Sequence, residues 1–231
     1  MANDPTLWQN EYRQRGIPSS FLATHSGILD LLYDYLKEQK ITLIDKTAAD
    51  LGCGRGRNTF SLINHGAKKV YAIDFVPAVI NAINTEARLK GLTNKIVALC
   101  SDLTKPWPIP DKSLDVALDI FCFKHQTDET KQQFYKSELN SKLKPGGLLL
   151  IDLAAADDGY YGALDKVEIK NDVFKITDPN TQVTSLLFTK ESLLREFRNF
   201  DVISFQNDKK EGDMHGQTYL RSTLKFLLKK T

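Results

Sequence analysis

Short apolar runs alternate with longer amphipathic segments along most of the chain. The runs span residues 46–51, 68–73, 95–100, 114–120 and 148–153. Their hydrophobicity is continuous rather than alternating, which is typical of strands that are covered on both faces. Segments with helical periodicity lie between them, and strands that alternate with helices form parallel sheets. The pattern therefore predicts an α/β domain built on a doubly wound, largely parallel sheet.

The amphipathic segments have recognisable ends. Segment 77–90 begins at Pro77 and is followed by Gly91, residues that favour the first turn and the C-terminal cap of a helix. Segment 128–143 stops at a Lys-Pro-Gly-Gly sequence. Ahead of the first strand, Ser19 can act as an N-cap. The helix expected after it has an apolar stripe of Phe21, His25, Ile28, Leu29, Leu32 and Leu36.

The C-terminal region changes this rhythm. A helix over 190–199 leads to a strand over 201–206, a polar loop over 207–216 and a strand over 219–228. Because a loop of this kind is too short for a helical crossover, the last two strands must be antiparallel. We expect a single Rossmann-like, doubly wound sheet of seven strands, mostly parallel with an antiparallel last strand. No linker interrupts the pattern, which indicates one domain over residues 1–231.

Composition agrees with a globular domain and excludes several classes of protein. The chain has 231 residues, 42% hydrophobic and 26% charged, and a net charge of +2. The apolar runs are too short to cross a bilayer, and the polar N-terminus lacks the apolar core of a signal peptide. Three scattered cysteines fit neither a disulfide framework nor a metal site. We expect a cytoplasmic domain without metal or membrane, and the charge balance gives no reason to expect a nucleic-acid partner.

The clearest chemical signal follows the first strand, in the sequence Asp-Leu-Gly-Cys-Gly-Arg-Gly-Arg-Asn over 50–58. Gly52, Gly54 and Gly56 let the backbone turn tightly and approach a ligand, and the helix that follows directs N–H groups toward it. Alone, such a loop is a weak signal, because any tight strand-to-helix turn uses glycine. Arg57 stands where the last glycine of the GxGxxG pattern would be, which argues against a nicotinamide-binding domain.

Aspartates stand at the ends of three consecutive predicted strands. Asp50 precedes the glycines and suits an ammonium group better than a pyrophosphate. Asp74 can accept hydrogen bonds from both hydroxyls of a ribose, and Asp102 can accept one from an exocyclic adenine amine. Each aspartate alone is more often a turn residue or a helix cap. Together they indicate a nucleoside ligand with an amino-acid tail.

These segments resemble the motifs of the class I S-adenosylmethionine-dependent methyltransferases. DLGCGRGRN resembles the first motif of that family, VYAID the second, ALCSD the third and WPIPDKSLDVAL the fourth, and KPGG resembles the entry to its fifth strand. The resemblance covers nearly the whole chain. LWQNEYRQRGIPSSFL and GRGRN are similar to the small bacterial tellurite- and thiopurine-resistance methyltransferases. The resemblance implies a methyltransferase that uses S-adenosylmethionine and releases S-adenosylhomocysteine.

The resemblance also implies cofactor contacts at the ends of four strands. The methionine part would lie on the glycine-rich loop and near the fourth strand, the ribose on an aspartate, and the adenine between residues after the second and third strands. The positions are Asp50, Gly52, Gly54, Ile120 and Phe121 for methionine, Asp74 for ribose, and Phe75, Val76, Asp102 and Leu103 for adenine. Arg55 stands where the family commonly has a small residue or Thr, and we expect its side chain to point outward.

Substrate recognition is expected outside these motifs, because open α/β sheets bind ligands beyond the carboxyl ends of their strands. Trp8 and Tyr12 lie one helical turn apart in an N-terminal helical lid over 1–40, where they either line the cleft or anchor the helix. Tyr160 and Tyr161 lie between glycines in a substrate-side insertion over 154–188. They form either a mobile flap over the substrate or a packed connection.

Two histidines are candidates for catalysis, since histidine titrates near neutral pH. His125 follows the fourth strand. His215 lies beside Gly216 in the loop after a strand expected to run parallel to the first five, so we predict that it faces the transferable methyl group. A base is needed only if the acceptor must lose a proton. The alternatives are a capped surface residue for His125 and a solvated hairpin for His215.

The sequence specifies the methyl donor better than the acceptor. A sulfonium is already an activated donor, so transfer needs mainly orientation and exclusion of water. We expect in-line transfer to a small-molecule acceptor. The alternatives are an RNA or protein methyltransferase of the same fold and a non-catalytic module that binds S-adenosylmethionine.

Overall fold

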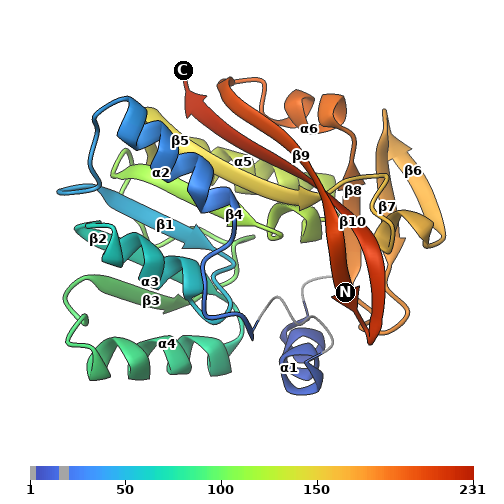
Figure 1. The fold of residues 1–231 in the computed structure, drawn as a ribbon, viewed down its shortest axis with the longest axis horizontal. Helices are drawn as coiled ribbons and strands as arrows, with labels where there is room; N and C mark the ends of the chain where they lie inside the picture. The colour runs from blue at the N-terminus through green and yellow to red at the C-terminus, as the bar shows by residue number, and fades with distance from the viewer. Residues whose placement is uncertain (1–3, 16–20) are drawn as a thin grey trace.

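The central sheet has seven strands in the order β3-β2-β1-β4-β5-β10-β9 (Figure 1). The computed structural model describes residues 4–15 and 21–231, so the expected cap Ser19 lies outside the described residues. The first five strands pair in parallel, whereas β10 is antiparallel to both β5 and β9. The predicted α/β fold with an antiparallel last strand is therefore confirmed.

Each apolar run of the sequence forms one of the first five strands. The bounds in the sheet are β1 Thr47–Leu51, β2 Lys69–Asp74, β3 Ile96–Cys100, β4 Leu114–Ile120, β5 Leu143–Ala154, β9 Phe200–Met214 and β10 Gln217–Lys230. β5 shows why the hydrophobicity is continuous. Leu148 and Leu150 pack into one core cluster, and Leu149, Ile151 and Leu153 pack into another on the opposite face. A strand buried on both faces carries mostly apolar side chains, and the one acidic residue of this run, Asp152, is buried as well.

Helices cover both faces of the sheet. α2 (Ile28–Glu38), α3 (Arg57–Asn64) and α4 (Pro77–Leu89) bury their apolar residues in one cluster, and α5 (Glu129–Lys142) and α6 (Lys190–Glu196) contribute to the other. α1 (Pro5–Gln14) lies beyond the carboxyl ends of the strands (Figure 1). No helix in the described part of the chain is long and apolar enough to span a membrane. The layered core leaves one end of the sheet open for a site.

The N-terminal helix begins later than expected. α2 starts at Ile28 after Gly27, so Phe21 and His25 precede it rather than extend its stripe. The remaining stripe residues are buried, as the periodicity predicts. His25 packs edge-on against the rings of Tyr33 and His65, with centroids 5.7 and 6.4 Å away. These aromatic contacts stabilise the turn that precedes the helix.

The region after β5 differs most from the expectation. Residues 154–188 contain a small antiparallel sheet of β6 (Lys166–Lys170), β7 (Val173–Thr177) and β8 (Thr184–Phe188). The polar loop expected over 207–216 is wrong, because β9 and β10 continue to pair from Asn207–Leu224 out to Met214–Gln217. β5 pairs with β10 only as far as Thr223. The hairpin therefore projects beyond the sheet as an arm, and its polar residues lack the apolar pattern of a buried strand.

Candidate functional site

A cavity of about 220 Å³ lies at the carboxyl ends of β1 to β4, with α1 on its outer side. It is several times larger than the roughly 30 Å³ of a water molecule, so it can hold part of a small ligand. All cofactor residues expected from the sequence line it, namely Asp50, Gly52, Gly54, Asp74, Phe75, Val76, Asp102, Leu103, Ile120 and Phe121. Residues from four strand ends, far apart in sequence, thus converge on one space.

The glycine-rich loop forms the floor of this cavity and requires glycine at each position. Gly52, Gly54 and Gly56 have φ values of 70°, 52° and 81°, in the left-handed region that side chains disfavour. A Cβ atom at Gly52 would lie 2.8 Å from the Sγ of Cys122, and one at Gly54 would lie 2.8 Å from the hydroxyl of Tyr12. The loop therefore presents bare backbone to the cavity, as a closely approaching ligand requires.

Asp74, the last residue of β2, joins this loop to the next one. Its carboxylate accepts hydrogen bonds from the backbone N–H of Gly54 at 3.0 Å and of Val76 at 2.9 Å. Burial raises the pKa of Asp74, and the N–H donors oppose that rise. A carboxylate accepts about four hydrogen bonds, so lone pairs remain for a ligand in the cavity that Asp74 lines.

Asp50 is buried beneath the methionine side of the cavity. Its carboxylate accepts a 2.7 Å hydrogen bond from the hydroxyl of Thr59 on α3. Burial nevertheless raises the pKa of Asp50 to about 6. An ammonium group beside a buried carboxylate would favour its charged form. The site therefore fits a ligand with a positively charged amine, which agrees with the role expected from the sequence.

The segments after β2 and β3 form another part of the cavity lining. Phe75 and Val76 line it from β2, and Leu103 lines it after β3. One oxygen of Asp102 accepts from both the N–H and the hydroxyl of Thr104, each at 2.9 Å. Asp102 is thus a turn residue as well as a cavity residue, and its other oxygen makes no hydrogen bond within residues 4–15 and 21–231. Arg55 is exposed, but it lines the mouth of the cavity and its guanidinium lies over the Phe21 ring, so the expectation that it points outward is only partly met.

Asp119 near the end of β4 shapes the cavity, although the sequence pattern did not single it out. The buried carboxylate accepts from the backbone N–H groups of Cys122 and Phe123 at 3.0 Å and from the hydroxyl of Tyr135. These bonds close a sharp turn in which Phe121 has a φ of 61°. Burial raises the pKa of Asp119 to about 6. A strained aromatic residue is thereby held at the cavity wall.

α1 contributes the outer wall. Asp4 caps this helix by accepting from the N–H of Thr6 at 2.8 Å, and Pro5 occupies its first position. Trp8 and Tyr12 both line the cavity. Burial raises the pKa of Tyr12 well above its ordinary value, with the charge of Asp74 acting in the same direction. The two rings therefore line the cleft and do not serve only to anchor the helix.

His125 also reaches the cavity and packs edge-on against Trp8, with ring centroids 4.8 Å apart. Its Nδ1 lies 3.0 Å from the hydroxyl of Ser185 on β8. Burial lowers the pKa of His125 to about 3, and the charge of Lys124 acts in the same direction. The imidazole is therefore neutral near pH 7 and weakly basic, which suits a positioning contact better than proton abstraction.

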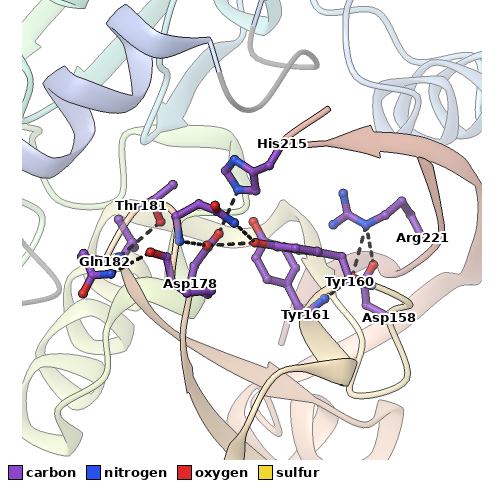
Figure 2. Close-up of polar contacts among 11 residues, drawn as sticks. Asp158, Tyr160, Tyr161, Asp178, Thr181, Gln182, His215 and Arg221 are labelled. Atoms are coloured by element: carbon purple, nitrogen blue, oxygen red, sulfur yellow. Dashed lines mark hydrogen bonds and ion pairs between the residues drawn. The ribbon is translucent and has the colours of Figure 1, made fainter. Parts of the chain in front are cut away.

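The two tyrosines and His215 lie in one polar cluster (Figure 2). The hydroxyl of Tyr160 donates to Asp178 at 2.9 Å, and Nε2 of His215 lies 3.2 Å from the other oxygen of Asp178. Both tyrosines are buried, so the structure shows them packed. Tyr161 lines the cavity, whereas Tyr160 and His215 lie behind its lining, where His215 faces Asp178. The neighbour of His215, Met214, does line it.

Sequence patterns missed two charged residues at this end of the cavity. Arg221 on β10 lines it and binds the buried Asp158. Lys124 is fully buried, and its Nζ has no hydrogen-bond partner in residues 4–15 and 21–231. Burial lowers the pKa of Lys124 to about 7. Lys124 lies directly before His125, but only the tertiary structure shows that it is enclosed.

Comparison with known proteins accounts for the loop, the aspartates and the sheet order together. A family model described as a methyltransferase domain matches residues 48–147, which contain β1 to β4 and the start of β5. The match indicates a methyltransferase domain over these residues. The resemblance to the class I S-adenosylmethionine-dependent methyltransferases that the sequence predicts is thus confirmed, and S-adenosylmethionine is the cofactor of that superfamily.

Solved methyltransferases share the fold. A SAM-dependent methyltransferase from Methanosarcina mazei has a TM-score of 0.67 at 20% identity, over 90% of this chain and 98% of that one. Another from Aquifex aeolicus has a TM-score of 0.62 at 17% identity, over 99% of each chain. At these identities the likeness establishes the fold of the methyltransferase.

Curated relatives match this methyltransferase over shorter stretches. A tRNA N(3)-cytidine methyltransferase from Gallus gallus is 32% identical over 107 residues, which are 44% of this chain and 28% of that protein. A ribosomal protein L11 methyltransferase from Psychrobacter cryohalolentis is 37% identical over 78 residues, 33% of this chain and 25% of that protein. The chain thus spans less than half the length of these relatives.

Proposed function

We propose that the chain binds S-adenosylmethionine in this cavity and transfers its methyl group to a small-molecule acceptor. The observation that carries the proposal is the convergence of Asp50, Asp74 and Asp102, from three consecutive strand ends, on one cavity floored by bare glycine backbone. A carboxylate for an amine, one for a ribose and one for an adenine amine together suit a nucleoside with an amino-acid tail. Resemblance to the superfamily supports the same ligand.

Each part of the cofactor has proposed partners. Asp74 would bind the ribose hydroxyls with the lone pairs that Gly54 and Val76 leave free. Asp102 and Leu103 would contact the adenine edge and one face, and Phe75 with Val76 the other face. Gly52, Gly54, Ile120 and Phe121 would surround the methionine part, with Asp50 near its amine. The complete set lines the cavity.

The bound cofactor would supply an activated methyl group, so the chain mainly has to orient the acceptor and exclude water. Trp8 and Tyr12 on α1 cover the cavity from the outside. We propose that residues 1–231 form one domain in which 1–40 act as a helical lid and 154–188 form the substrate-side insertion. Where an acceptor must lose a proton, we propose His215 as the base, which requires its imidazole to leave Asp178 and reach the cavity beside Met214, and His125, which already lines the cavity, as a neutral contact.

A macromolecular acceptor is the second candidate, and the named relatives favour it. The relatives with 32% and 37% identity carry names that assign them tRNA and ribosomal protein L11 as substrates. The net charge of +2 with interspersed signs gives little electrostatic support for RNA binding. Trp8 and Tyr12 of α1 cover the cavity from the outside, so we place the macromolecular acceptor second.

Calorimetric titration with S-adenosylhomocysteine tests the cofactor site. We predict one-to-one binding by the wild type and a roughly tenfold to hundredfold loss of affinity in Asp74→Ala, because unpaired hydroxyls cost about 1–3 kcal/mol. Asp111→Ala removes an exposed carboxylate that precedes β4 and does not line the cavity, and it serves as the matched control. Equal affinity in Asp74→Ala, or tighter binding of NAD than of S-adenosylhomocysteine, would contradict the proposal.

Donor turnover across acceptor classes tests the reaction. The chain is incubated with S-adenosylmethionine and, separately, a thiol, an amine, a metalloid oxyanion, total tRNA and ribosomal protein, and release of S-adenosylhomocysteine is measured. We expect turnover with a small molecule. Turnover confined to tRNA or to ribosomal protein would favour the second candidate, and binding of the cofactor without turnover on any class would favour a non-catalytic module.

A further inference from the structure

The two sides of the cavity differ in charge. The carboxylates that line it, Asp50, Asp74 and Asp102, all belong to the ends of β1 to β3, and Arg55 and Arg57 of the loop after β1 line the same side, so this side carries charges of both signs. The opposite wall is built by α1, the turn after β4, the 154–188 segment and the hairpin arm. In the described residues, the lining of that wall contains no carboxylate, and its charged group is the guanidinium of Arg221. A ligand that reaches this wall meets a cation and aromatic rings.

Arg221 is fixed along one edge only. Its Nε donates to both oxygens of Asp158, at 2.9 and 3.2 Å (Figure 2). Figure 2 shows the two terminal nitrogens directed away from Asp158, and they make no hydrogen bond within residues 4–15 and 21–231. A guanidinium carries five N–H donors, so most of its hydrogen-bonding capacity remains available on the cavity side. Such an edge matches the two oxygens of a carboxylate.

The carboxylate that orients Arg221 is itself rigid. Asp158 is completely buried and accepts from the backbone N–H groups of Tyr160, Tyr161 and Ser222 at 2.8 to 3.1 Å. These donors lie on the insertion and on β10, so Asp158 ties the two segments together. The guanidinium is therefore preorganised and loses little conformational entropy on binding.

The ring of Tyr161 lies next to two basic side chains. Its ring lies 5.1 Å from Cζ of Arg221 and 3.8 Å from Nζ of the buried Lys124. Burial of an ammonium group without a hydrogen-bond partner is costly, so its retention beside this ring calls for an explanation. Arg221 and Lys124 both contact the ring of Tyr161, but only Arg221 lines the cavity, so the guanidinium is the group on this wall that can bind an anion.

The rest of the wall is mainly aromatic and apolar, with His125 and Gln126 as its other polar side chains. Trp8, Phe121 and Met214 line it beside Tyr161, and His125 packs edge-on against Trp8. Aromatic walls of this kind pack against planar apolar groups. The combination of flat apolar surfaces with one preorganised guanidinium is more specific than either feature alone.

We propose that this wall binds the methyl acceptor as a small molecule with a planar apolar body and an anionic group such as a carboxylate, with Arg221 as the residue that binds the anion. The inference rests on the proposed function, because it assigns the substrate class of the same site. An anionic acceptor is also attracted electrostatically to a cationic sulfonium donor. Asp158 acts through Arg221 and is a positioning residue.

The test uses three probes that share a ring and differ in charge. Benzoate, benzamide and benzylamine are titrated by ligand-observed NMR into the full chain saturated with S-adenosylhomocysteine, whose own binding is measured first. We expect benzoate to bind about tenfold more tightly than benzamide, and benzylamine to bind most weakly. Equal binding of benzoate and benzamide would overturn the proposal. Failure to bind S-adenosylhomocysteine in the first titration would instead contradict the proposed function.

Variants then assign the effect to one residue. We expect Arg221→Gln to abolish the preference for benzoate, Arg221→Lys to retain part of it, and Arg88→Gln, a matched change on the exposed face of α4, to leave it intact. Asp158 keeps its three backbone donors in Arg221→Gln, so the variant should fold, and unchanged affinity for S-adenosylhomocysteine verifies this. A preference that survives Arg221→Gln, or an Arg221→Gln variant that loses affinity for S-adenosylhomocysteine, would overturn the assignment.

Discussion

The two sides of the cavity are built in different ways. On the cofactor side, the side chains follow the strands of the parallel sheet and are held by donors close to them in the chain, as Asp50 is by Thr59 and Asp74 is by Val76. On the acceptor side, contacts join segments far apart in the chain, such as Asp158 with Arg221 and Asp178 with His215. Local turns at the ends of the parallel strands position the residues of the cofactor side. Tertiary contacts between the insertion and the hairpin arm position those of the acceptor side.

This difference explains why the sequence indicates the methyl donor but says much less about the methyl acceptor. Local turns have sequence signatures, because glycine at positive φ and aspartate at a strand end are dictated by the backbone. Tertiary pairs have none, since either partner can be replaced when the other changes. Substitutions on the two sides should therefore separate cofactor affinity from acceptor chemistry.

The largest effect is expected where the two sides meet, at Asp119. Asp119→Ala removes the acceptor of the N–H groups of Cys122 and Phe123 and of the Tyr135 hydroxyl. Each stranded donor costs about 1–3 kcal/mol, so we expect a loss of roughly 3–5 kcal/mol in the free energy of unfolding. Urea denaturation measures it. Asp119→Asn keeps one oxygen and should lose less, and a loss below about 1 kcal/mol in Asp119→Ala would show that the turn does not depend on this carboxylate.

His215 tests whether the acceptor side contributes chemistry. We expect His215→Ala to slow turnover on the true acceptor about a hundredfold, because loss of a general base typically has that effect. Affinity for S-adenosylhomocysteine should stay constant, since the cofactor residues lie on other strands. His25→Ala, which removes a histidine that packs against Tyr33 and His65 before α2 and not against Asp178, is the control. Nearly full turnover by His215→Ala would reduce the residue to a link between the hairpin and Asp178.

Lys124 should make stability depend on pH. Burial lowers its pKa to about 7 in the folded chain, from about 10.4 when unfolded, so unfolding takes up a proton between these values and stability rises with pH there. We expect the free energy of unfolding of the wild type to gain about 2 kcal/mol from pH 7 to 9 relative to Lys124→Met. Denaturation of both proteins at the two pH values measures the difference. If the free energies of unfolding of the two proteins change with pH in the same way, the pKa of Lys124 is not lowered by burial.

The sequence predicted the first five strands of the central sheet far better than the small sheet and the hairpin arm. β1 to β5 were recognisable because burial on both faces demands continuous apolar runs. The small sheet was not predicted, since its strands are only five residues long and their pairing depends on contacts between β6, β7 and β8 that no single segment encodes. The hairpin arm was taken for a loop for the same reason, as its outer residues pair with each other and not with a core.

The same contrast holds for single residues. The ten expected cofactor residues line one cavity because their positions are fixed relative to strand ends. Arg221 is one of several polar residues in β10, where polar and apolar positions alternate. Its hydrogen bond to Asp158 distinguishes it from the others. Lys124 is ordinary in sequence, and its burial depends on packing against Tyr161 from the insertion. Such roles arise from contacts that no local pattern encodes.

Amide hydrogen exchange with and without S-adenosylhomocysteine tests the division of the cavity most directly. Binding should slow exchange in residues 50–56, 74–76 and 101–103, which form the cofactor side. The small sheet, residues 166–188, should exchange at the same rate in both states because none of its residues lines the cavity. Protection confined to the small sheet and the hairpin arm, with none at the glycine-rich loop, would contradict the placement of the cofactor.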